Sequence, residues 1–441
     1  MSPPDGEADL GGAPCEGPVA RHLLPDTAVV TGSGSLEVAG VDVVALAEEF
    51  GTPLFVYDEA TLRARCREVV TAFGPGSAYA TKAFLCRAMA ELAIDEGLRL
   101  DVSTDGELGV ALAAGAEPER IVFHGNNKSD AELSAGVGIG VGRHVVDSFD
   151  EIDRLARLLD DRRRGSRQKL LLRVNPGIEA HTHEFVATGQ EDSKFGFSVA
   201  TGAAREALGA LRNLPGAEVV GIHAHIGSQI QRLEPFEKLA AVLTPIVAAN
   251  GLAELCVGGG LGVAYLSDES APTITEWAAT VRAGCAAAGM PPGVQITAEP
   301  GRSIVATAAL TCYRVGTIKE LPGIRNFVAV DGGMSDNPRP VLYGSGYEAF
   351  LPRNVAAERP YPATIVGKHC ESGDIVIAEA RLPGDLAVGD ILVTPVTGAY
   401  GFSMASNYNR VGRPPVVFVH EGRARLVVRR ETVEDLLRLE S

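Results

Sequence analysis

The chain has 441 residues, of which 46% are hydrophobic and 22% are charged, and its formal net charge at pH 7 is −16. This length allows two or three domains, and the acidic charge argues against nucleic acid or an anionic membrane as the main partner. No apolar run is long enough to span a membrane, and seven scattered cysteines without a Cys-x-x-Cys pair favour a reducing cytoplasm.

The N-terminal part of the chain predicts a tail followed by a β segment. Residues 1–25 are rich in Pro, Gly and acidic side chains and lack the basic and apolar regions of a signal peptide, so we expect a disordered tail. "TPLFVYD" (52–58) is rich in β-forming residues. We therefore expect the segment 26–57 to pack with a β domain elsewhere in the chain.

Between residues 58 and 305, short β-rich runs alternate with amphipathic helical patterns. The eight runs are 77–82, 99–104, 120–125, 143–148, 169–174, 219–227, 254–260 and 294–302. Eight such units over this length predict a (β/α)8 TIM barrel, with an open doubly wound sheet as the alternative.

From residue 306 to residue 441 the pattern changes, because strand-like runs follow one another without long helical patterns between them. These runs are 309–321, 325–333, 363–370, 374–382, 390–396 and 415–430. The spacing predicts a separate all-β domain at the C-terminus, completed by the N-terminal segment.

The predicted barrel strands carry polar residues where they end. Active sites of such barrels lie at the carboxyl ends of the strands, so these residues are expected to meet at one rim. They are Lys82, Asp101, Ser103, His124, Asn126, Asn127, Arg173, Asn175, His223, His225, Ser228, Gly258, Gly259, Gly260, Glu299, Gly301 and Arg302.

Lys82 in "YATKAF" (79–84) stands out because only seven of the 40 basic residues are lysines. It follows an apolar run, and a lysine at the end of a buried element is costly unless it is paired or its charge is removed. A covalent bond from the amine would remove the charge. A plain salt bridge is the alternative.

Two further motifs at the rim have more than one interpretation. "GGGLG" (258–262) is either a tight turn or a phosphate cradle, and the loops after strands seven and eight are the usual phosphate site of a barrel. The pairs "HTH" (181–183) and "HAH" (223–225) could bind a metal, although stacked or capped histidines are commoner. We predict no metal site.

The whole set indicates more than its members do. A lysine, a phosphate cradle, a carboxylate and flat imidazoles on one rim are what pyridoxal 5′-phosphate (PLP) requires. The lysine would bond to the cofactor, and the glycines would hold its phosphate. The carboxylate would keep the pyridine nitrogen protonated, and an imidazole would lie on the ring.

The motifs along residues 27–441 resemble those of the fold-type III PLP decarboxylases, and among these the diaminopimelate decarboxylases. They occur in order through both predicted domains. They are "YATKAF", "HGNNKS" (124–129), "EAHTHEFVATGQEDSKFGF" (179–197), "GIHAHIGSQI" (221–230), "GGGLG", "EPGR" (299–302), "DGGMSDNPRPVLYG" (331–344), "GKHCESGD" (367–374) and "GAYGFSMASNYN" (398–409).

The resemblance implies a carboxy-lyase that converts meso-2,6-diaminopimelate to L-lysine and CO2, the last step of lysine biosynthesis. Lys82 would carry the cofactor, His225 would stack on its ring, and Glu299 would pair with the ring nitrogen. The cofactor contacts it implies are Lys82, Asp101, His225, Ser228, Gly258, Gly259, Gly260, Glu299, Gly301, Arg302 and Tyr400.

The resemblance also implies a homodimer with shared active sites, in which Cys370 comes from the partner subunit and donates a proton. The implied substrate contacts are Arg302, Arg339, Tyr343, Glu371 and Tyr400. For Cys370 the alternative is a buried small hydrophobic residue, and for Arg339 it is an ion pair with a neighbour such as Asp336.

Three other functions remain open from the sequence. The enzyme could act on ornithine, arginine or a carrier-bound amino acid. The chain could bind PLP without turnover, or it could be a barrel metallohydrolase that uses the histidine pairs. The segment 179–197 is long enough to form a lid over the site.

Overall fold

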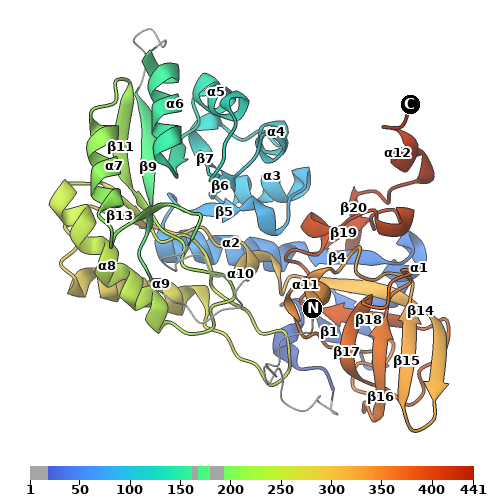
Figure 1. Ribbon diagram of the computed structural model, residues 1–441. Coiled ribbons are helices and arrows are strands. Elements are labelled where there is room, and N and C mark those ends of the chain that lie inside the picture. Colours follow the sequence, from blue (N-terminus) through green and yellow to red (C-terminus); the bar gives the residue numbers. More distant parts are fainter. Residues whose placement is uncertain (1–17, 161–166, 179–192) are drawn as a thin grey trace.

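The computed structural model describes residues 18–160, 167–178 and 193–441. Figure 1 shows a barrel surrounded by helices beside a second unit made mainly of strands. The pair "HTH" and most of the predicted lid lie outside the described residues. In the described ranges no helix is long and apolar enough to cross a membrane.

Eight parallel strands form the barrel in the order of the chain. Ala78 N–H donates to the carbonyl of Ala298 and Ala80 N–H to that of Pro300, at 3.0 and 3.1 Å, so the first strand also meets the last. The predicted barrel is therefore confirmed, and the open sheet is excluded. The strands are β5 (Ala78–Ala80), β6 (Arg99–Val102), β7 (Ile121–Phe123), β8 (Arg143–Val146), β9 (Gln168–Asn175), β11 (Ala217–His223), β12 (Glu254–Cys256) and β13 (Gln295–Thr297). A short strand, β10 (Phe197–Ser198), pairs with β9.

Alternation along the strands divides the apolar residues between two faces. On β9, for example, Leu170 and Leu172 belong to the large core shared with the helices. Leu171 instead joins a smaller cluster inside the barrel. Its other members each come from a different strand and are Ala78, Val122, Val145, Val220 and Cys256.

A ring of helices covers the outside of the barrel (Figure 1). Their starts are set locally, since Ser129 with Glu132 and Thr273 with Glu276 form capping boxes. The helices are α2 (Glu59–Phe73), α3 (Arg87–Asp95), α4 (Asp105–Ala113), α5 (Asp130–Ile139), α6 (Phe149–Asp160), α7 (Ala203–Arg212), α8 (Glu234–Asn250), α9 (Ile274–Ala287) and α10 (Arg302–Val305). Trp277 of α9 is fully buried between Phe73 and Phe236, which ties α2, α8 and α9 together.

The β domain is a sheet in the order β17-β16-β15-β14-β4-β19-β20, with β18 also paired to β14. One strand of this sheet comes from the N-terminal segment. It is β4 (Leu54–Asp58), which lies between β14 and β19 although the whole barrel separates it from them in the chain. The N-terminal segment thus completes the domain, as predicted. The other strands are β14 (Ala309–Leu321), β15 (Arg325–Val330), β16 (Tyr361–Val366), β17 (Ile375–Leu382), β18 (Ile391–Pro395), β19 (Val416–His420) and β20 (Arg423–Val428).

Smaller elements flank this sheet. A three-stranded sheet of β1 (Val29–Val30), β2 (Leu36–Val38) and β3 (Val41–Asp42) precedes α1 (Val43–Phe50). The predicted helix-free pattern is interrupted by the short helices α11 (Arg339–Tyr343) and α12 (Val433–Leu437). The run 415–430 is a hairpin, because Glu421 and Gly422 take positive φ angles of 45° and 72° and turn the chain.

The predicted tail of residues 1–25 extends too far into the described part of the chain. Arg21–Leu23 form a 3-10 helix, and Leu23 and Leu24 are buried in the main core. Leu23 and Leu24 anchor this segment to the core. The prediction of disorder used the composition of the whole stretch, in which two leucines have little weight.

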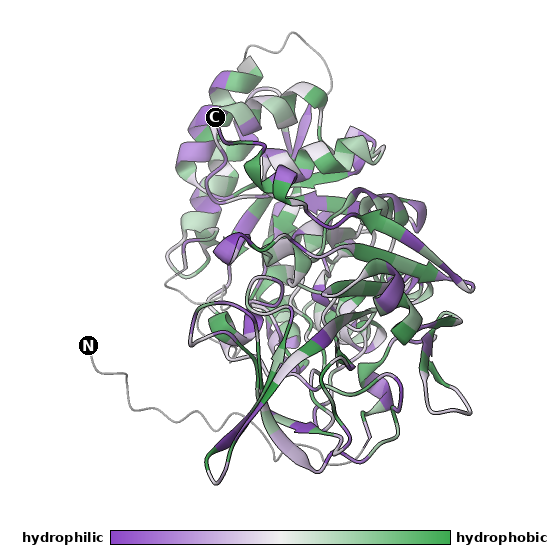
Figure 2. Ribbon diagram, turned by 90° about the vertical axis from the view of Figure 1, so that its right-hand side faces the viewer, coloured by the Kyte–Doolittle hydropathy of each residue, from purple (hydrophilic) through white to green (hydrophobic). Residues whose placement is uncertain are grey.

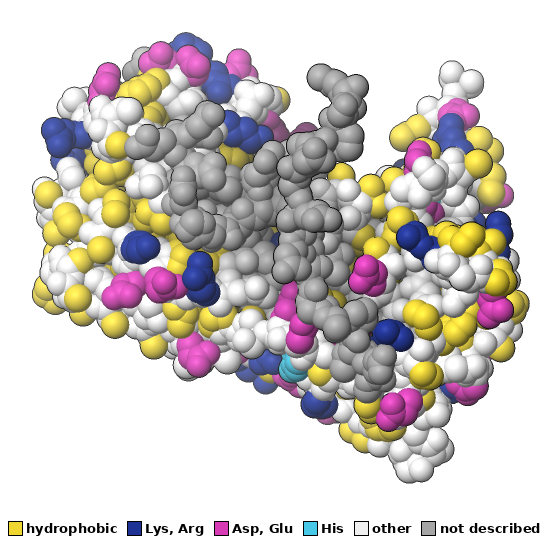
Figure 3. Space-filling model, turned by 60° about the horizontal axis from the view of Figure 1, so that its bottom comes forward, with side chains coloured by type: hydrophobic (Ala, Val, Ile, Leu, Met, Phe, Trp, Pro, Cys, Tyr) yellow, Lys and Arg dark blue, Asp and Glu magenta, His cyan; other side chains and the backbone are white. Residues whose placement is uncertain are grey.

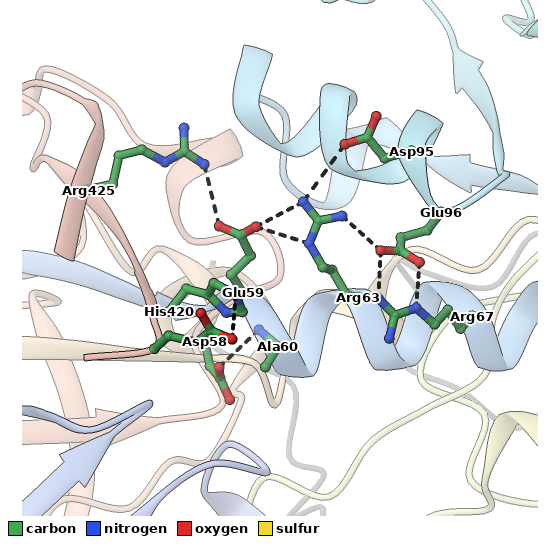
Figure 4. A network of polar contacts seen from close by, with 10 residues as sticks. Asp58, Glu59, Ala60, Arg63, Arg67, Asp95, Glu96, His420 and Arg425 are labelled. Atoms are coloured by element: carbon green, nitrogen blue, oxygen red, sulfur yellow. Dashed lines mark hydrogen bonds and ion pairs between the residues drawn. The ribbon is translucent and has the colours of Figure 1, made fainter. Parts of the chain in front are cut away.

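The two units also meet through charged side chains at the start of α2 (Figure 4). Glu59 lies 2.9 Å from Arg63 on the same helix and 3.5 Å from Arg425 on β20. Glu96, which follows α3, pairs with Arg63 at 2.8 Å and with Arg67 at 2.6 Å. This network connects helices of the barrel with an edge strand of the β domain.

The colouring in Figure 2 follows this architecture, since hydrophobic residues run along the strands and the packed faces of the helices. On the face seen in Figure 3, acidic and basic side chains are interspersed, singly or in small groups. The described residues on that face form no broad basic surface of the kind that binds nucleic acid (Figure 3).

Candidate active site

A cavity of about 510 Å³ opens at the carboxyl ends of the barrel strands, and the β domain contributes part of its wall. Most residues predicted for the site line it. These are Lys82, Asp101, His225, Ser228, Gly259, Gly260, Glu299, Gly301, Arg302, Tyr343 and Tyr400. Gly258, Arg339, Cys370 and Glu371 do not line the cavity within the chain as described.

Lys82 lies in a single 3-10 turn, Thr81–Ala83, directly after β5. Its side chain is exposed to the cavity, and in the described ranges it forms no ion pair, so the salt-bridge interpretation is wrong there. The other lysines of interest differ. Lys128 is buried with its amine 2.9 Å from Glu151, whereas Lys194 also lines the cavity.

Glu299 is held by two histidines on the floor of the cavity. Its Oε1 lies 3.0 Å from Nε2 of His124, and its Oε2 lies 2.9 Å from Nε2 of His223. The two imidazole rings meet edge to face at 4.8 Å, and Asp101 lies 3.6 Å from His124. All four side chains are largely buried, so each hydrogen bond is formed in a medium that strengthens it.

These contacts determine where the charges lie. Burial alone would raise the pKa of Glu299, but His124 and His223 hold it well below its ordinary value. Burial lowers the pKa of His223 to about 4. Burial also acts to lower the pKa of His124, but Asp101 and Glu299 outweigh it and raise that pKa. Glu299 is therefore an ionised acceptor between two imidazoles, of which that of His223 is neutral.

The same three groups are the only described set that could ligate a metal, with their ligand atoms within 4.8 Å of one another. The predicted pair of His223 and His225 does not act together. His223 turns toward Glu299, while Nδ1 of His225 accepts a hydrogen bond from the N–H of Gly259 at 3.2 Å. Burial lowers the pKa of His225 well below its ordinary value, so its ring is neutral with the proton on Nε2.

The glycines of "GGGLG" let the ends of neighbouring strands approach closely. A Cβ on Gly260, whose φ is +106°, would lie 2.3 Å from the carbonyl oxygen of Gly227. Among the hydrogen bonds of the described residues, none uses the backbone N–H of Gly260, Gly301 or Arg302. These donors lie beside Ser228 and Tyr400 on the same wall of the cavity.

Two buried guanidinium groups lie at the β-domain side of the site. Arg302 donates to the hydroxyl of Tyr265 at 2.6 Å and to Ser228 at 2.9 Å. Arg339 packs on the ring of Tyr265 and donates to the hydroxyl of Tyr347. Neither arginine forms an ion pair with any described residue, and the Nε atoms of both are buried without a hydrogen-bond partner.

The proposed pairing of Arg339 with Asp336 is wrong. The Asp336 carboxylate instead accepts hydrogen bonds from the hydroxyl of Tyr313 at 2.6 Å and from the N–H of Gly333 at 2.8 Å. Arg339 is thus a buried cation without an anionic partner in the described chain. Such a group requires an anion from elsewhere.

Cys370 is the exposed exception among the six described cysteines, all the others being buried. The interpretation as a buried small hydrophobic residue is therefore wrong. Its N–H donates to Asn409 at 2.9 Å, and the neighbouring His369 packs its ring near Tyr408 at 5.5 Å. The loop thus exposes Cys370 and Glu371 to solvent, and neither lines the cavity of its own chain.

The site contains residues to which the prediction gave no role. Arg173, which was expected at the rim without a role, lines the cavity, pairs with Asp147 at 3.4 Å and packs on Phe195 at 4.1 Å. His124 and His223 were recognised at strand ends but received no role. Tyr265 and Tyr347 do not line the cavity but hold Arg302 and Arg339, and no sequence pattern pointed to them because irregular loops lack periodicity.

Comparison with known proteins agrees with this geometry. Residues 59–306 match the family model "Pyridoxal-dependent decarboxylase, pyridoxal binding domain". Diaminopimelate decarboxylase of Mycobacterium tuberculosis is 47% identical over 442 residues, covering 96% of this chain and 98% of that protein. Its counterpart from Halalkalibacterium halodurans is 45% identical, covering 94% and 97%.

Solved structures show the same fold. Diaminopimelate decarboxylase of M. jannaschii in complex with L-lysine superposes with a TM-score of 0.86 at 31% identity, covering 94% of this chain and 98% of that one. The lysine/ornithine decarboxylase of Vibrio vulnificus, at 22% identity and a TM-score of 0.72, shares the fold. The chain belongs to the diaminopimelate decarboxylases, a family of pyridoxal-dependent decarboxylases.

Proposed function

We propose that this protein removes one carboxyl group of meso-2,6-diaminopimelate as CO2 and leaves L-lysine, with PLP as its cofactor. The observation that carries the proposal is the two-ended site. Lys82, His225, Glu299 and Arg302 line the cavity. Arg339 does not line it but contacts Tyr265, which also accepts a hydrogen bond from Arg302, and neither guanidinium forms an ion pair with a described residue. Such a site suits a substrate with a reacting amino-acid end and a distant carboxylate.

The residues of the cavity fit PLP. Lys82 has no ion-pair partner in the chain as described and would bond to the cofactor, and the neutral ring of His225 would lie on the cofactor ring. The N–H groups of Gly260, Gly301 and Arg302 would donate to the phosphate, with Ser228 and Tyr400 beside them. Gly259 and Asp101 line the same cavity, and Gly258 precedes Gly259 in the chain without lining it. Glu299 would pair with the ring nitrogen.

PLP, when bound, accepts the electron pair of the carbon–carbon bond that CO2 leaves. The protein would have to keep an ionised carboxylate for the ring nitrogen, and the two histidines on Glu299 would serve this purpose. A proton must then reach the α-carbon. Cys370 of the partner subunit would donate it from its thiol and recover a proton from solvent.

The far end of the substrate determines specificity. Its carboxylate would accept hydrogen bonds from Arg339 and Arg302, with Tyr343 on the cavity wall and Tyr400 beside Arg302. A guanidinium offers two parallel donors to a carboxylate, so it fixes direction as well as charge. Glu371, which is exposed next to Cys370, would pair with the far amine.

Cys370 and Glu371 are exposed and do not line their own cavity, which favours a homodimer in which each subunit completes the site of the other. An exposed catalytic thiol also requires the reducing conditions of the cytoplasm. We further propose the division into residues 26–57, a PLP-binding barrel at 58–305 and a β domain at 306–441.

The test is CO2 release by the PLP-loaded protein with a panel of amino acids. We expect meso-2,6-diaminopimelate to be the best substrate by kcat/KM and L-lysine to be its product. Faster turnover of ornithine or arginine would contradict the proposed substrate, because those molecules have no far carboxylate. Absence of CO2 from every substrate would leave only a PLP-binding protein, and absence of bound PLP would contradict the cofactor.

A further inference from the structure

Tyr265 lies between the two guanidinium groups of the site, and this position suggests a role beyond packing. The residue follows "GGGLG" after β12 and is 4% exposed. Its hydroxyl accepts a hydrogen bond from Arg302 at 2.6 Å, and the Arg339 guanidinium carbon lies 4.3 Å from the centre of its ring. Arg302 therefore meets the edge of this side chain and Arg339 meets its face.

The two arginines come from different parts of the fold. Arg302 begins α10 at the end of the last barrel strand, whereas Arg339 begins α11 in the β domain. Tyr347, also of the β domain, meets the ring of Tyr265 edge to face at 5.3 Å and accepts a hydrogen bond from Arg339. Tyr265 is thus a barrel side chain that contacts both cations.

The loop that carries Tyr265 is fastened to both units. The N–H of Tyr265 donates to Glu269 at 2.7 Å within the loop. Two residues later, the N–H of Ser267 donates to Glu348 of the β domain at 2.6 Å, and Glu348 also pairs with Arg359 at 2.7 Å. A side chain on this loop therefore holds its position relative to both Arg302 and Arg339.

Two buried cations that contact the same side chain repel each other, and neither has a carboxylate partner among the residues of the described chain. A tyrosine reduces this cost in two ways. Its oxygen accepts from one guanidinium, and the electron-rich face of its ring attracts the other. The tyrosine also separates the two guanidinium groups, because one lies at its hydroxyl and the other at the face of its ring.

We propose that Tyr265 is a positioning residue that sets the spacing between Arg302 and Arg339 and thereby selects substrates with a carboxylate at the far end. This inference rests on the proposed function. Arg302 is also held by Ser228, on the wall assigned to the cofactor phosphate. Tyr265 accordingly fixes the far carboxylate at one distance from the reacting end.

The test compares Tyr265→Phe, which loses the hydrogen bond to Arg302 but keeps the ring, with Tyr265→Leu, which loses both contacts. Tyr313→Phe is the matched control. It removes a buried hydroxyl whose hydrogen bond is also 2.6 Å long, and in the described chain Tyr313 makes no hydrogen bond or ring contact with either guanidinium. The unfolding midpoint of each variant reports any loss of stability.

Two ligands separate the carboxylate from the rest of the molecule. L-lysine and 1,5-diaminopentane differ by that one group, and their dissociation constants for the PLP-loaded protein are measured by calorimetry. For Tyr265→Phe we expect L-lysine to bind about tenfold more weakly, the loss typical of a hydrogen bond to a charged donor. Tyr265→Leu should weaken it further, and 1,5-diaminopentane should bind within about twofold of wild type in both.

Steady-state kinetics provides a second test. In both Tyr265 variants, KM for meso-2,6-diaminopimelate should rise by a larger factor than kcat falls. Tyr313→Phe should bind L-lysine as wild type does. Equal weakening of both ligands, or unchanged L-lysine binding in Tyr265→Leu, would overturn the inference alone. A wild-type protein that does not bind L-lysine would overturn the proposed function as well.

Discussion

The two histidines on Glu299 allow a quantitative prediction about catalysis. In His223→Leu, Oε2 of Glu299 loses its hydrogen-bond donor at 2.9 Å, and the carboxylate stays buried. A hydrogen bond to a charged group contributes about 1.5–3 kcal/mol, so the ionised carboxylate should be destabilised by that amount. If Glu299 serves the ring nitrogen, this corresponds to a fall in kcat of about 10- to 150-fold.

The pH profile distinguishes this effect from general damage. His223 helps to hold the pKa of Glu299 below its ordinary value, so its removal should raise that pKa. Because ionised Glu299 is the active form, the acid limb of kcat should move to higher pH. His223→Gln is the matched variant, since its amide N–H can donate to the same oxygen and should restore most of kcat.

The assay is steady-state CO2 release from pH 5 to pH 9, together with urea unfolding of each variant. His223→Leu should show a lowered kcat with KM nearly unchanged. A kcat within about twofold of wild type and an unmoved acid limb would refute the reasoning, because the donor would then contribute nothing to the charge of Glu299.

Three further predictions concern other parts of the molecule. Arg339→Ala should cost about 2–4 kcal/mol in kcat/KM for meso-2,6-diaminopimelate and leave the visible absorbance of bound PLP unchanged; full activity would contradict its role. Lys82→Ala and Cys370→Ala should each be inactive and should regain activity when mixed and reassembled, whereas no recovery despite subunit exchange would exclude a shared site. Burial raises the pKa of Asp336 from 3.8 to about 7. Between pH 3.8 and about pH 7 the folded protein therefore keeps a proton on Asp336 that the unfolded chain releases. The free energy of unfolding consequently falls as the pH rises through this range. Asp336→Asn should flatten this fall, by at most about 4 kcal/mol in urea unfolding; an unchanged slope would contradict it.

The fold could be predicted from sequence because its signals are local. Each barrel strand is a short apolar run, and the runs recur with helices between them, so β5 and β13 were found without tertiary information. Leu23 and Leu24 were missed because only contacts with the distant core make them structured. The turn in run 415–430 was missed because Glu421 gives no strong turn signal before Gly422.

The site was predictable to the extent that strand ends mark it. Lys82 and Glu299 were found because each follows the end of a barrel strand, the first and the last respectively. That His124 and His223 would both reach Glu299 follows only from closure of the barrel, which brings β7, β11 and the end of β13 together. Tyr265 lies in a loop whose course depends on the β domain, so no local pattern pointed to it.

The central claim is that Lys82 carries the cofactor in this cavity, and it can be tested directly. Lys194 lines the same cavity and is the rival, while Lys128 is buried in an ion pair with Glu151. The PLP-loaded protein is reduced with borohydride and digested, and the peptides are mapped by mass spectrometry. The account predicts the pyridoxyl group on Lys82 alone, whereas a label on Lys194 or on Lys128 would contradict it.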